Sequence, residues 1–141
     1  SLRSVIDLHS LGEKSIVVDC DVIQADGGTR TASITGGFVA LSLAIKEYMT
    51  SNKSIQNPIK DYVAAISCGI VKNQVLVDLD YSEDSIAEVD ANFVITQKSG
   101  FSEVQATGEE NTFNKNELLE MMEKVELVSE KIFKIQKDAL E

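Results

Sequence analysis

Apolar residues recur along this chain at two spacings, and these spacings predict its helices and strands. Three segments repeat their apolar positions every three or four residues, as one face of a helix does: Ser1–Ser10, Arg30–Met49 and Lys115–Ala139. Five shorter apolar runs are typical of strands: Ser15–Ile23, Val63–Val71, Val75–Leu79, Asn92–Gln97 and Phe101–Thr107. The order α-β-α-β-β-β-β-α predicts an α/β fold in which helices flank a mixed α+β sheet.

The two long helices have predicted buried faces. In the first of them this face contains Phe38, Leu41, Ala44, Ile45 and Tyr48. In the second it contains a longer stripe: Leu118, Met122, Val125, Val128, Ile132, Ile135 and Ala139. Asn114, followed three residues later by Glu117, predicts a capping box at the start of the last helix.

A polar connection, Ser51–Ile59, contains the only proline and is the best boundary between two parts of the chain. It predicts two lobes, residues 1–52 and 60–141. The chain opens with Ser1 rather than Met, inside a predicted helix, so we expect a fragment or a processed protein.

The composition is that of an ordinary globular protein, with 43% hydrophobic and 26% charged residues in 141. No apolar run reaches the length of a membrane-spanning helix, and no secretory signal is present. We therefore expect a cytoplasmic protein with no membrane partner. Cys20 and Cys68 lie inside apolar runs and are predicted to be buried free thiols. Neither has the spacing of a zinc ligand. His9 is expected on a helix surface.

The net charge is −10, from 13 basic and 23 acidic residues. Contacts to phosphates dominate the affinity of proteins for nucleic acids, so a nucleic-acid enzyme usually has a basic surface. This chain alone is therefore expected to bind RNA weakly.

A glycine-containing turn, Ala25–Gly37, joins a predicted strand to a predicted helix. Gly27 and Gly28 allow a sharp turn that exposes backbone N–H groups, and Thr29 and Arg30 add donors where the helix begins. A helix start favours anions, so this is a candidate phosphate site. It lacks the Lys-Ser/Thr pair of a Walker loop. A plain turn capped by Thr is an equally weighted alternative.

Three carboxylates lie close together in sequence, from the end of the third predicted strand, Val75–Leu79, onward. Asp78 and Asp80 alternate along that strand, so both side chains are expected on one face, and Asp84 can converge with Asp78. Oxygen ligands of this kind suit Mg²⁺ or Mn²⁺. An EF-hand fits poorly, because Glu83 stands at the position of its required glycine and Val89 at the position of its bidentate glutamate. From the residues alone, a solvated acidic loop is the favoured alternative.

Three blocks together resemble the ribonuclease PH family, in the family's order: Val18–Gly36, Val77–Asn92 and Glu103–Glu109. The resemblance runs from Ser1 to about Leu140. That family comprises bacterial phosphate-dependent 3′-to-5′ exoribonucleases, or tRNA nucleotidyltransferases, that trim tRNA and release nucleoside 5′-diphosphates. The resemblance implies the family's mixed sheet with flanking helices, with residues 1–52 ending the first lobe and 60–141 forming the C-terminal lobe. The family's N-terminal part, including a further phosphate-binding arginine, has no counterpart in this sequence.

The resemblance also implies roles for individual residues. Gly28, Thr29 and Arg30 match the residues that hold inorganic phosphate, the co-substrate. Asp78 and Asp84 match the pair that holds a divalent metal ion, Mg²⁺ or Mn²⁺, and takes part in catalysis.

Asp80 is a weaker metal candidate, and Glu88 and Asp90 are expected to frame the same loop. The implied partners are the 3′ ends of tRNA and other RNAs, further copies in a hexameric trimer of dimers, and a separate N-terminal half. The alternative function is a non-catalytic ring or scaffold subunit of an exosome-like assembly.

Overall fold

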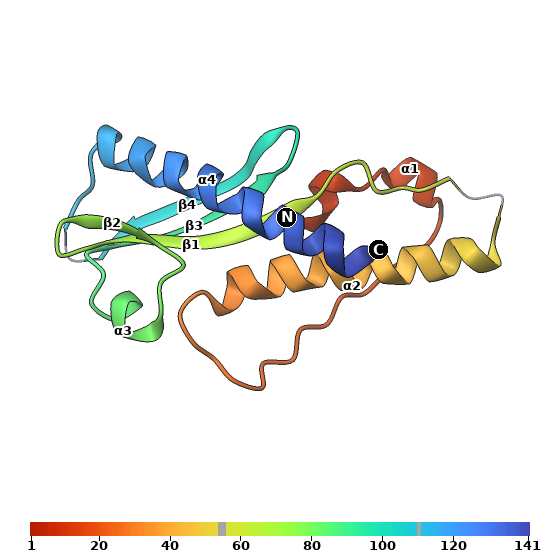
Figure 1. Ribbon diagram of the computed structural model, residues 1–141, viewed down its shortest axis with the longest axis horizontal. Coiled ribbons are helices and arrows are strands. Elements are labelled where there is room, and N and C mark those ends of the chain that lie inside the picture. Colours follow the sequence, from red (N-terminus) through yellow and green to blue (C-terminus); the bar gives the residue numbers. More distant parts are fainter. Residues whose placement is uncertain (54–55, 110) are drawn as a thin grey trace.

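Four antiparallel strands form one sheet in the computed structural model, which describes residues 1–53, 56–109 and 111–141 (Figure 1). Residues 54 and 55 of the predicted connection therefore lie outside the described residues. The strand order is β2-β1-β3-β4, and the strands are β1 (Val63–Val71), β2 (Gln74–Val77), β3 (Val89–Thr96) and β4 (Gly100–Gly108). The predicted α/β fold with flanking helices is confirmed, and every strand pair in the described residues is antiparallel.

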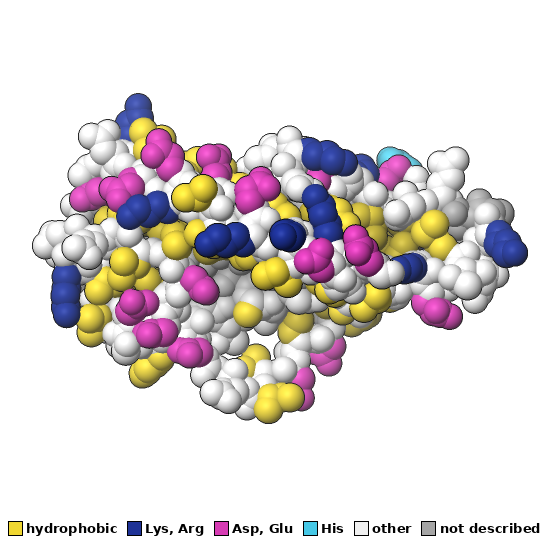
Figure 2. Space-filling view, viewed as in Figure 1, with side chains coloured by type: hydrophobic (Ala, Val, Ile, Leu, Met, Phe, Trp, Pro, Cys, Tyr) yellow, Lys and Arg dark blue, Asp and Glu magenta, His cyan; other side chains and the backbone are white. Residues whose placement is uncertain are grey.

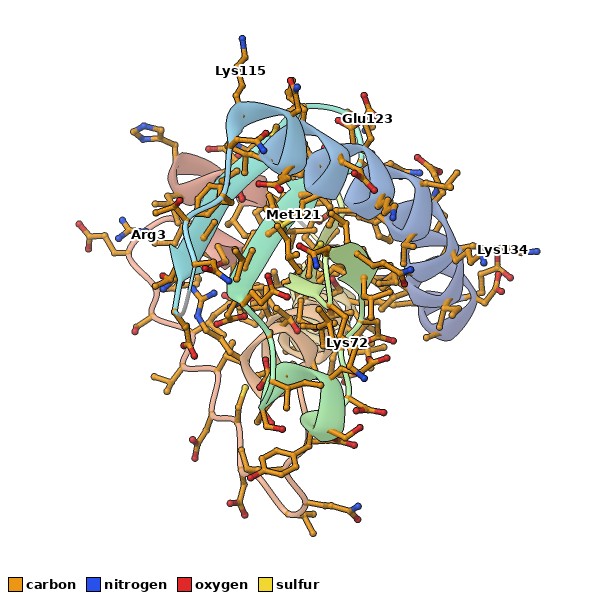
Figure 3. The ribbon with its side chains drawn as sticks, turned by 90° about the vertical axis from the view of Figure 1, so that its left-hand side faces the viewer. Arg3, Lys72, Lys115, Met121, Glu123 and Lys134 are labelled. Atoms are coloured by element: carbon orange, nitrogen blue, oxygen red, sulfur yellow. The ribbon has the colours of Figure 1, made fainter. Side chains whose placement is uncertain are left out.

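The helix α4 (Lys115–Leu140) covers one face of the sheet. Its Met121 points toward the strands (Figure 3) and packs with Val125 and Phe133 on the even-numbered side chains of β1. The predicted capping box is present, since Asn114 and Glu117 each accept a hydrogen bond from the other's backbone N–H. The start of this helix is thus encoded by its first turn.

The predicted apolar stripe of α4 is only partly correct. Ile135 is 66% exposed, whereas the polar residues Ser129 and Gln136 are buried. The buried positions step through 121, 125, 129, 133 and 136, so the true contact line passes through two polar residues. The spacing of apolar residues does not identify such positions. Gln136 is polar, and in its buried position its Nε2 donates hydrogen bonds to the C=O groups of Thr35 and Val63.

The other face of the sheet packs against the long helix α2 (Thr29–Ser51) and the short 3-10 helix η1 (Leu2–Val5). Phe38 of α2 and Val5 of η1 contact Val63, Ala65 and Val94 on the odd-numbered face of β1 and its partner strand. Of the predicted buried face of α2, Phe38, Leu41 and Ile45 are buried, whereas Ala44 and Tyr48 are exposed.

The first half of β1, Val63–Ser67, has one edge with no strand beside it, because β2 pairs only with Cys68–Val71. Side chains from the two helices satisfy its backbone instead. Thr35 Oγ1 accepts from the N–H of Ala65 at 3.0 Å and donates to its C=O at 3.2 Å. Gln136 Nε2 donates to the C=O of Val63 at 2.9 Å. The edge therefore fixes α2 and α4 to the same strand.

The predicted strand Ser15–Ile23 is wrong. These residues run as irregular chain, with Val17 86% and Ile23 96% exposed. A strand needs a neighbour for its N–H and C=O groups, and within the described residues the segment pairs with no strand of the sheet. Cys20 is consequently exposed, which contradicts its predicted burial. Cys68 is buried as predicted, and burial raises the pKa of its thiol to about 12.

The predicted helix over Ser1–Ser10 is interrupted. It forms η1 and a second short helix, α1 (Leu8–Leu11), and Ile6 between them bridges to Ile59 instead. Asp7 caps α1 by accepting from the N–H groups of the next turn, so the chain restarts its helix there. His9 lies on the surface as expected. Of the helices in the described ranges, none combines the length and apolar character needed to span a bilayer.

The edge contacts predict a specific loss of stability. Thr35→Val keeps the shape of the side chain but leaves the N–H and C=O of Ala65 without their partner, so the free energy of unfolding should fall by about 1–3 kcal/mol. Thr50→Val is the matched control, because its hydroxyl bonds only the preceding turn of the same helix. Urea denaturation measures both, and equal losses would contradict the role given to Thr35.

Candidate functional site

The glycine turn places the start of α2 at Thr29, directly after Gly28 in the left-handed conformation (φ +72°). No side chain among the described residues caps this helix. The backbone N–H groups of its first turn therefore remain available to an anion, which the helix dipole also favours. Thr29 Oγ1 donates to the C=O of Asp26 at 2.8 Å, so this hydroxyl closes the turn.

The glycine turn lies directly against the chain that follows β2. A Cβ on Gly27 would lie 2.1 Å from the carbonyl oxygen of Leu79, and one on Gly28 would lie 3.0 Å from Ser67 Oγ. Only glycine fits at position 27 without displacing backbone. The sequence-predicted phosphate turn and the sequence-predicted acidic loop are thus in direct contact.

Asp26 connects the same two segments by hydrogen bonds. Its Oδ1 accepts from the N–H of Gly27 at 2.8 Å and from the N–H of Tyr81, 55 positions later, at 2.6 Å. Tyr81 begins the short helix α3 (Tyr81–Asp84). Sequence reasoning missed Asp26, although the residue immediately precedes the glycines; nothing in the local pattern points to Tyr81.

Asp78 is not part of a strand, which corrects the predicted strand over Val75–Leu79. The strand β2 ends at Val77, and Asp78 has a φ of +60°. Its N–H donates to the C=O of Ser67 at 2.8 Å. Because the chain turns here, Asp78 and Asp80 do not alternate on one strand face as expected. A non-glycine residue in this backbone region is uncommon and is characteristic of turns and functional sites.

Asp80 caps α3. Its Oδ1 accepts from Ser82 Oγ at 2.6 Å and from the N–H of Glu83 at 2.9 Å. In return, the N–H of Asp80 donates to Glu83 Oε2 at 3.2 Å. These hydrogen bonds, first that of Ser82, hold the pKa of Asp80 below its ordinary value. The contacts of this carboxylate are those of a helix cap.

Asp84 ends α3, next to further acidic residues. Burial, and then the charges of Asp84 and Glu109, raise the pKa of Asp90. Negative charge is thus concentrated at this corner. Across residues 1–53, 56–109 and 111–141, no three His, Cys, Asp or Glu side chains are placed to hold a metal together. Mg²⁺ is commonly held by one or two carboxylates, with water and substrate phosphates completing its shell. Asp78 and Asp84 are carboxylates of the type that such a site uses, and their role as metal ligands stays a prediction.

Arg30 is oriented by a carboxylate from β4. Its Nη2 pairs with Glu103 Oε1, while the arginine side chain stays 49% exposed. Ser1 Oγ donates to the other oxygen of Glu103 at 3.1 Å. The hydrogen bond from Arg30 is the main cause that lowers the pKa of Glu103. In the sequence, Glu103 stands out only as the first residue of a block that resembles the family. Its pairing with Arg30 has no local signal, because 73 positions separate the two residues.

The Gly27 contact predicts opposite effects at two glycines. Gly27→Ala forces a methyl group into the backbone of Leu79 and should lower the free energy of unfolding by about 1–3 kcal/mol. Gly36→Ala places its methyl group in open space on α2 and should raise that free energy by roughly 0.5–1 kcal/mol. Chemical denaturation measures both variants. Two stabilised proteins would show that the glycine turn does not touch the acidic loop.

The Arg30–Glu103 pair predicts a pH effect. Because the folded pKa of Glu103 is lowered, the pair stabilises the protein above the ordinary glutamate pKa and this contribution is lost as pH falls through the folded pKa. Arg30→Met should raise the pKa of Glu103 in an NMR titration, whereas Lys46→Met, elsewhere on α2, should leave it unchanged. An unchanged pKa in Arg30→Met would contradict the pairing.

Two family models match this chain in order. They are described as the 3′ exoribonuclease family, domain 1, over residues 1–47, and domain 2, over residues 61–124. Ribonuclease PH of Bacillus cereus (strain AH820) and of Bacillus anthracis are each 52% identical over 141 residues. In both cases the match covers 99% of this chain and 58% of the relative, so the chain spans little more than half the length of these proteins.

Solved structures share the fold at low sequence identity. Rice (Oryza sativa) Rrp46 has a TM-score of 0.68 at 21% identity, over 84% of this chain and 50% of that one. A chain of an archaeal exosome core has a TM-score of 0.62 at 17% identity, over 84% and 47%. With both family domains matched in sequence order and ribonuclease PH proteins about half identical along its whole length, this chain belongs to the 3′ exoribonuclease family.

Proposed function

We propose that this chain forms part of a phosphorolytic 3′-to-5′ exoribonuclease that trims the 3′ ends of tRNA and other RNAs in the cytoplasm. The observation that carries the proposal is the contact between the glycine turn and the acidic loop. Gly27 lies against Leu79, and Asp26 binds the N–H of Tyr81. An anion-binding turn and a carboxylate loop that belong to one site have to meet in this way.

In the proposed reaction, inorganic phosphate binds at the first turn of α2 and at Arg30. One phosphate oxygen attacks the phosphorus of the last internucleotide link. A new P–O bond forms as the bond to the 3′ oxygen of the preceding nucleotide breaks. The products are a nucleoside 5′-diphosphate and an RNA shorter by one nucleotide, whose 3′ oxygen takes up a proton. We assign Asp84 to relay this proton to the 3′ oxygen from the attacking hydrogen phosphate, which loses it as the new P–O bond forms.

The residue types suit this chemistry. The attacking phosphate is already an anion at neutral pH, so the site needs no strong base; it has to bring two anions together. Arg30 can contribute because Glu103 engages only one of its nitrogens, and guanidinium has five N–H donors. A divalent cation, Mg²⁺ or Mn²⁺, held by Asp78 and Asp84 would screen the charges of the two phosphates.

A second candidate function is a non-catalytic ring or scaffold subunit of an exosome-like assembly. The fold shared with rice Rrp46 and with the archaeal exosome core favours it. A scaffold has no need to keep a phosphate turn and a carboxylate loop together. The presence of Gly28-Thr29-Arg30 together with Asp78 and Asp84 in one chain therefore favours the enzyme. We propose that this enzyme works in the family's hexamer.

Arg30 provides the test. The chain is combined with an N-terminal half from a ribonuclease PH relative and given 3′-extended tRNA and Mg²⁺, with or without phosphate. Arg30→Ala should lower the release of nucleoside diphosphate by about 10²–10³-fold. Arg30→Lys should also lose activity, because lysine lacks the planar fork. Lys115→Ala, an exposed lysine on α4, is the control.

The products separate the alternatives. Nucleoside diphosphate formed only with phosphate supports the proposal, whereas nucleoside monophosphate would indicate hydrolysis and contradict it. RNA binding without turnover would favour the scaffold. Near-normal phosphate-dependent rates in Arg30→Ala would remove this residue from the site.

A further inference from the structure

A cavity lies toward the C-terminal end of α2, away from the glycine turn at its start. This cavity, of about 760 Å³, is bounded by the C-terminal part of α2, the end of α4, the chain entering β1 and the β3–β4 turn. Four of the 13 basic residues line it: Lys46, Lys60, Lys98 and Lys137. None of these lysines belongs to the site described above.

Two of the ammonium groups are positioned on the cavity wall. Lys46 Nζ donates to the C=O of Leu140 at 2.7 Å, and Lys137 Nζ lies 5.4 Å from the ring centroid of Tyr62. Leu140 and Tyr62 also line the cavity. Both positive charges are therefore directed to the cavity by neutral groups, which leave the charge uncompensated.

The third placed ammonium belongs to Lys98, whose Nζ donates to the C=O of Lys60 at 3.3 Å. One acidic residue, Asp61, lines the same cavity among the described residues. Its two oxygens already accept the N–H groups of Tyr62 and Lys98, each at 2.8 Å. In the described ranges no carboxylate lies within 4.0 Å of any of these four lysines. The cavity thus combines four positive charges with one negative charge.

The wider surface near this cavity is not uniformly basic. On the face seen in Figure 2, Lys and Arg side chains gather around the C-terminal end of α4, with acidic side chains between them. The concentration of unpaired lysines in one cavity is therefore a local feature of an otherwise acidic chain with a net charge of −10.

We propose that this cavity binds the phosphodiester backbone of single-stranded RNA, away from the reacting 3′ end. The inference rests on the proposed function, which makes RNA the polyanion that this chain meets. Lysines are compact point charges without a fixed fork, so they suit sequence-independent phosphate contacts. Lys46 stands 16 positions after Arg30 in α2, which at 1.5 Å per residue separates the two sites by about 24 Å.

The chain offers a matched set of control lysines. Lys115, Lys131 and Lys134 are exposed on α4 and do not line the cavity. Figure 3 shows Lys115 and Lys134 pointing away from the body of the molecule. Replacing either set of three lysines by glutamine changes the net charge equally, so the comparison isolates position from total charge.

The experiment measures RNA binding rather than turnover. Fluorescence anisotropy follows a labelled 12-nucleotide oligoadenylate binding to the chain in phosphate-free buffer from 50 to 200 mM salt. The variant Lys46→Gln/Lys98→Gln/Lys137→Gln should bind at least tenfold more weakly. Its slope of log affinity against log salt should be shallower by about 2, since each lost contact to a single strand contributes about 0.7. Lys115→Gln/Lys131→Gln/Lys134→Gln should change both quantities much less.

The outcomes are separable. Equal losses in the two triple variants, or no RNA binding by the parent chain at 50 mM salt, would overturn the proposal. Displacement of the RNA by polyglutamate at the same charge concentration would indicate a general anion site and would also overturn it. Circular dichroism checks that each variant is folded. If lysine-dependent binding is found but no phosphate-dependent turnover occurs, the proposed function fails while this binding site stands.

Discussion

The unpaired edge of β1 is the constraint on which the arrangement of this molecule depends. β2 reaches only the far half of β1, so the backbone groups of Val63–Ser67 that face that side lack a strand partner. Leaving such groups buried and unbonded costs about 1–3 kcal/mol each. Gln136 from α4, Thr35 from α2 and the N–H of Asp78 supply the missing partners. Three segments far apart in sequence are thereby held along one strand edge.

The candidate site follows from that edge. Thr35 fixes α2 against β1 about 1.7 turns after the helix begins, which brings the glycine turn beside the chain leaving β2. The same edge holds Asp78 in its positive-φ conformation through Ser67. Gly27 and Asp26 then complete the contact. The contacts that cover the edge of β1 therefore also bring the proposed phosphate-binding turn and the carboxylate loop together.

Local chemistry was readable from the sequence, whereas long-range pairing was not. The spacing of apolar residues located α2, α4 and four strands, and Asn114 with Glu117 marked a helix start. The strand predicted over Ser15–Ile23 was wrong. Alternation of apolar and polar residues indicates the two faces of a strand, but not the neighbouring strand that its backbone N–H and C=O groups require. The Arg30–Glu103 pair and the Asp26 bond to Tyr81 span 73 and 55 positions, and no local pattern encodes such distances. The glycine and carboxylate motifs were found, but their contact required the fold.

Net charge is a weak guide to whether such a chain meets RNA. At physiological ionic strength the Debye length is about 8 Å, so exposed charges farther apart are largely screened from one another. The acidic helix α3, which ends at Asp84, contacts the glycine turn through the N–H of Tyr81, whereas the lysine-lined cavity lies toward the other end of the 23-residue helix α2. In the proposed complex, these two regions lie against separate parts of one RNA strand. A total of −10 limits non-specific adhesion of polyanions over most of the surface, and the phosphate contacts that we propose depend on local groups at either end of α2.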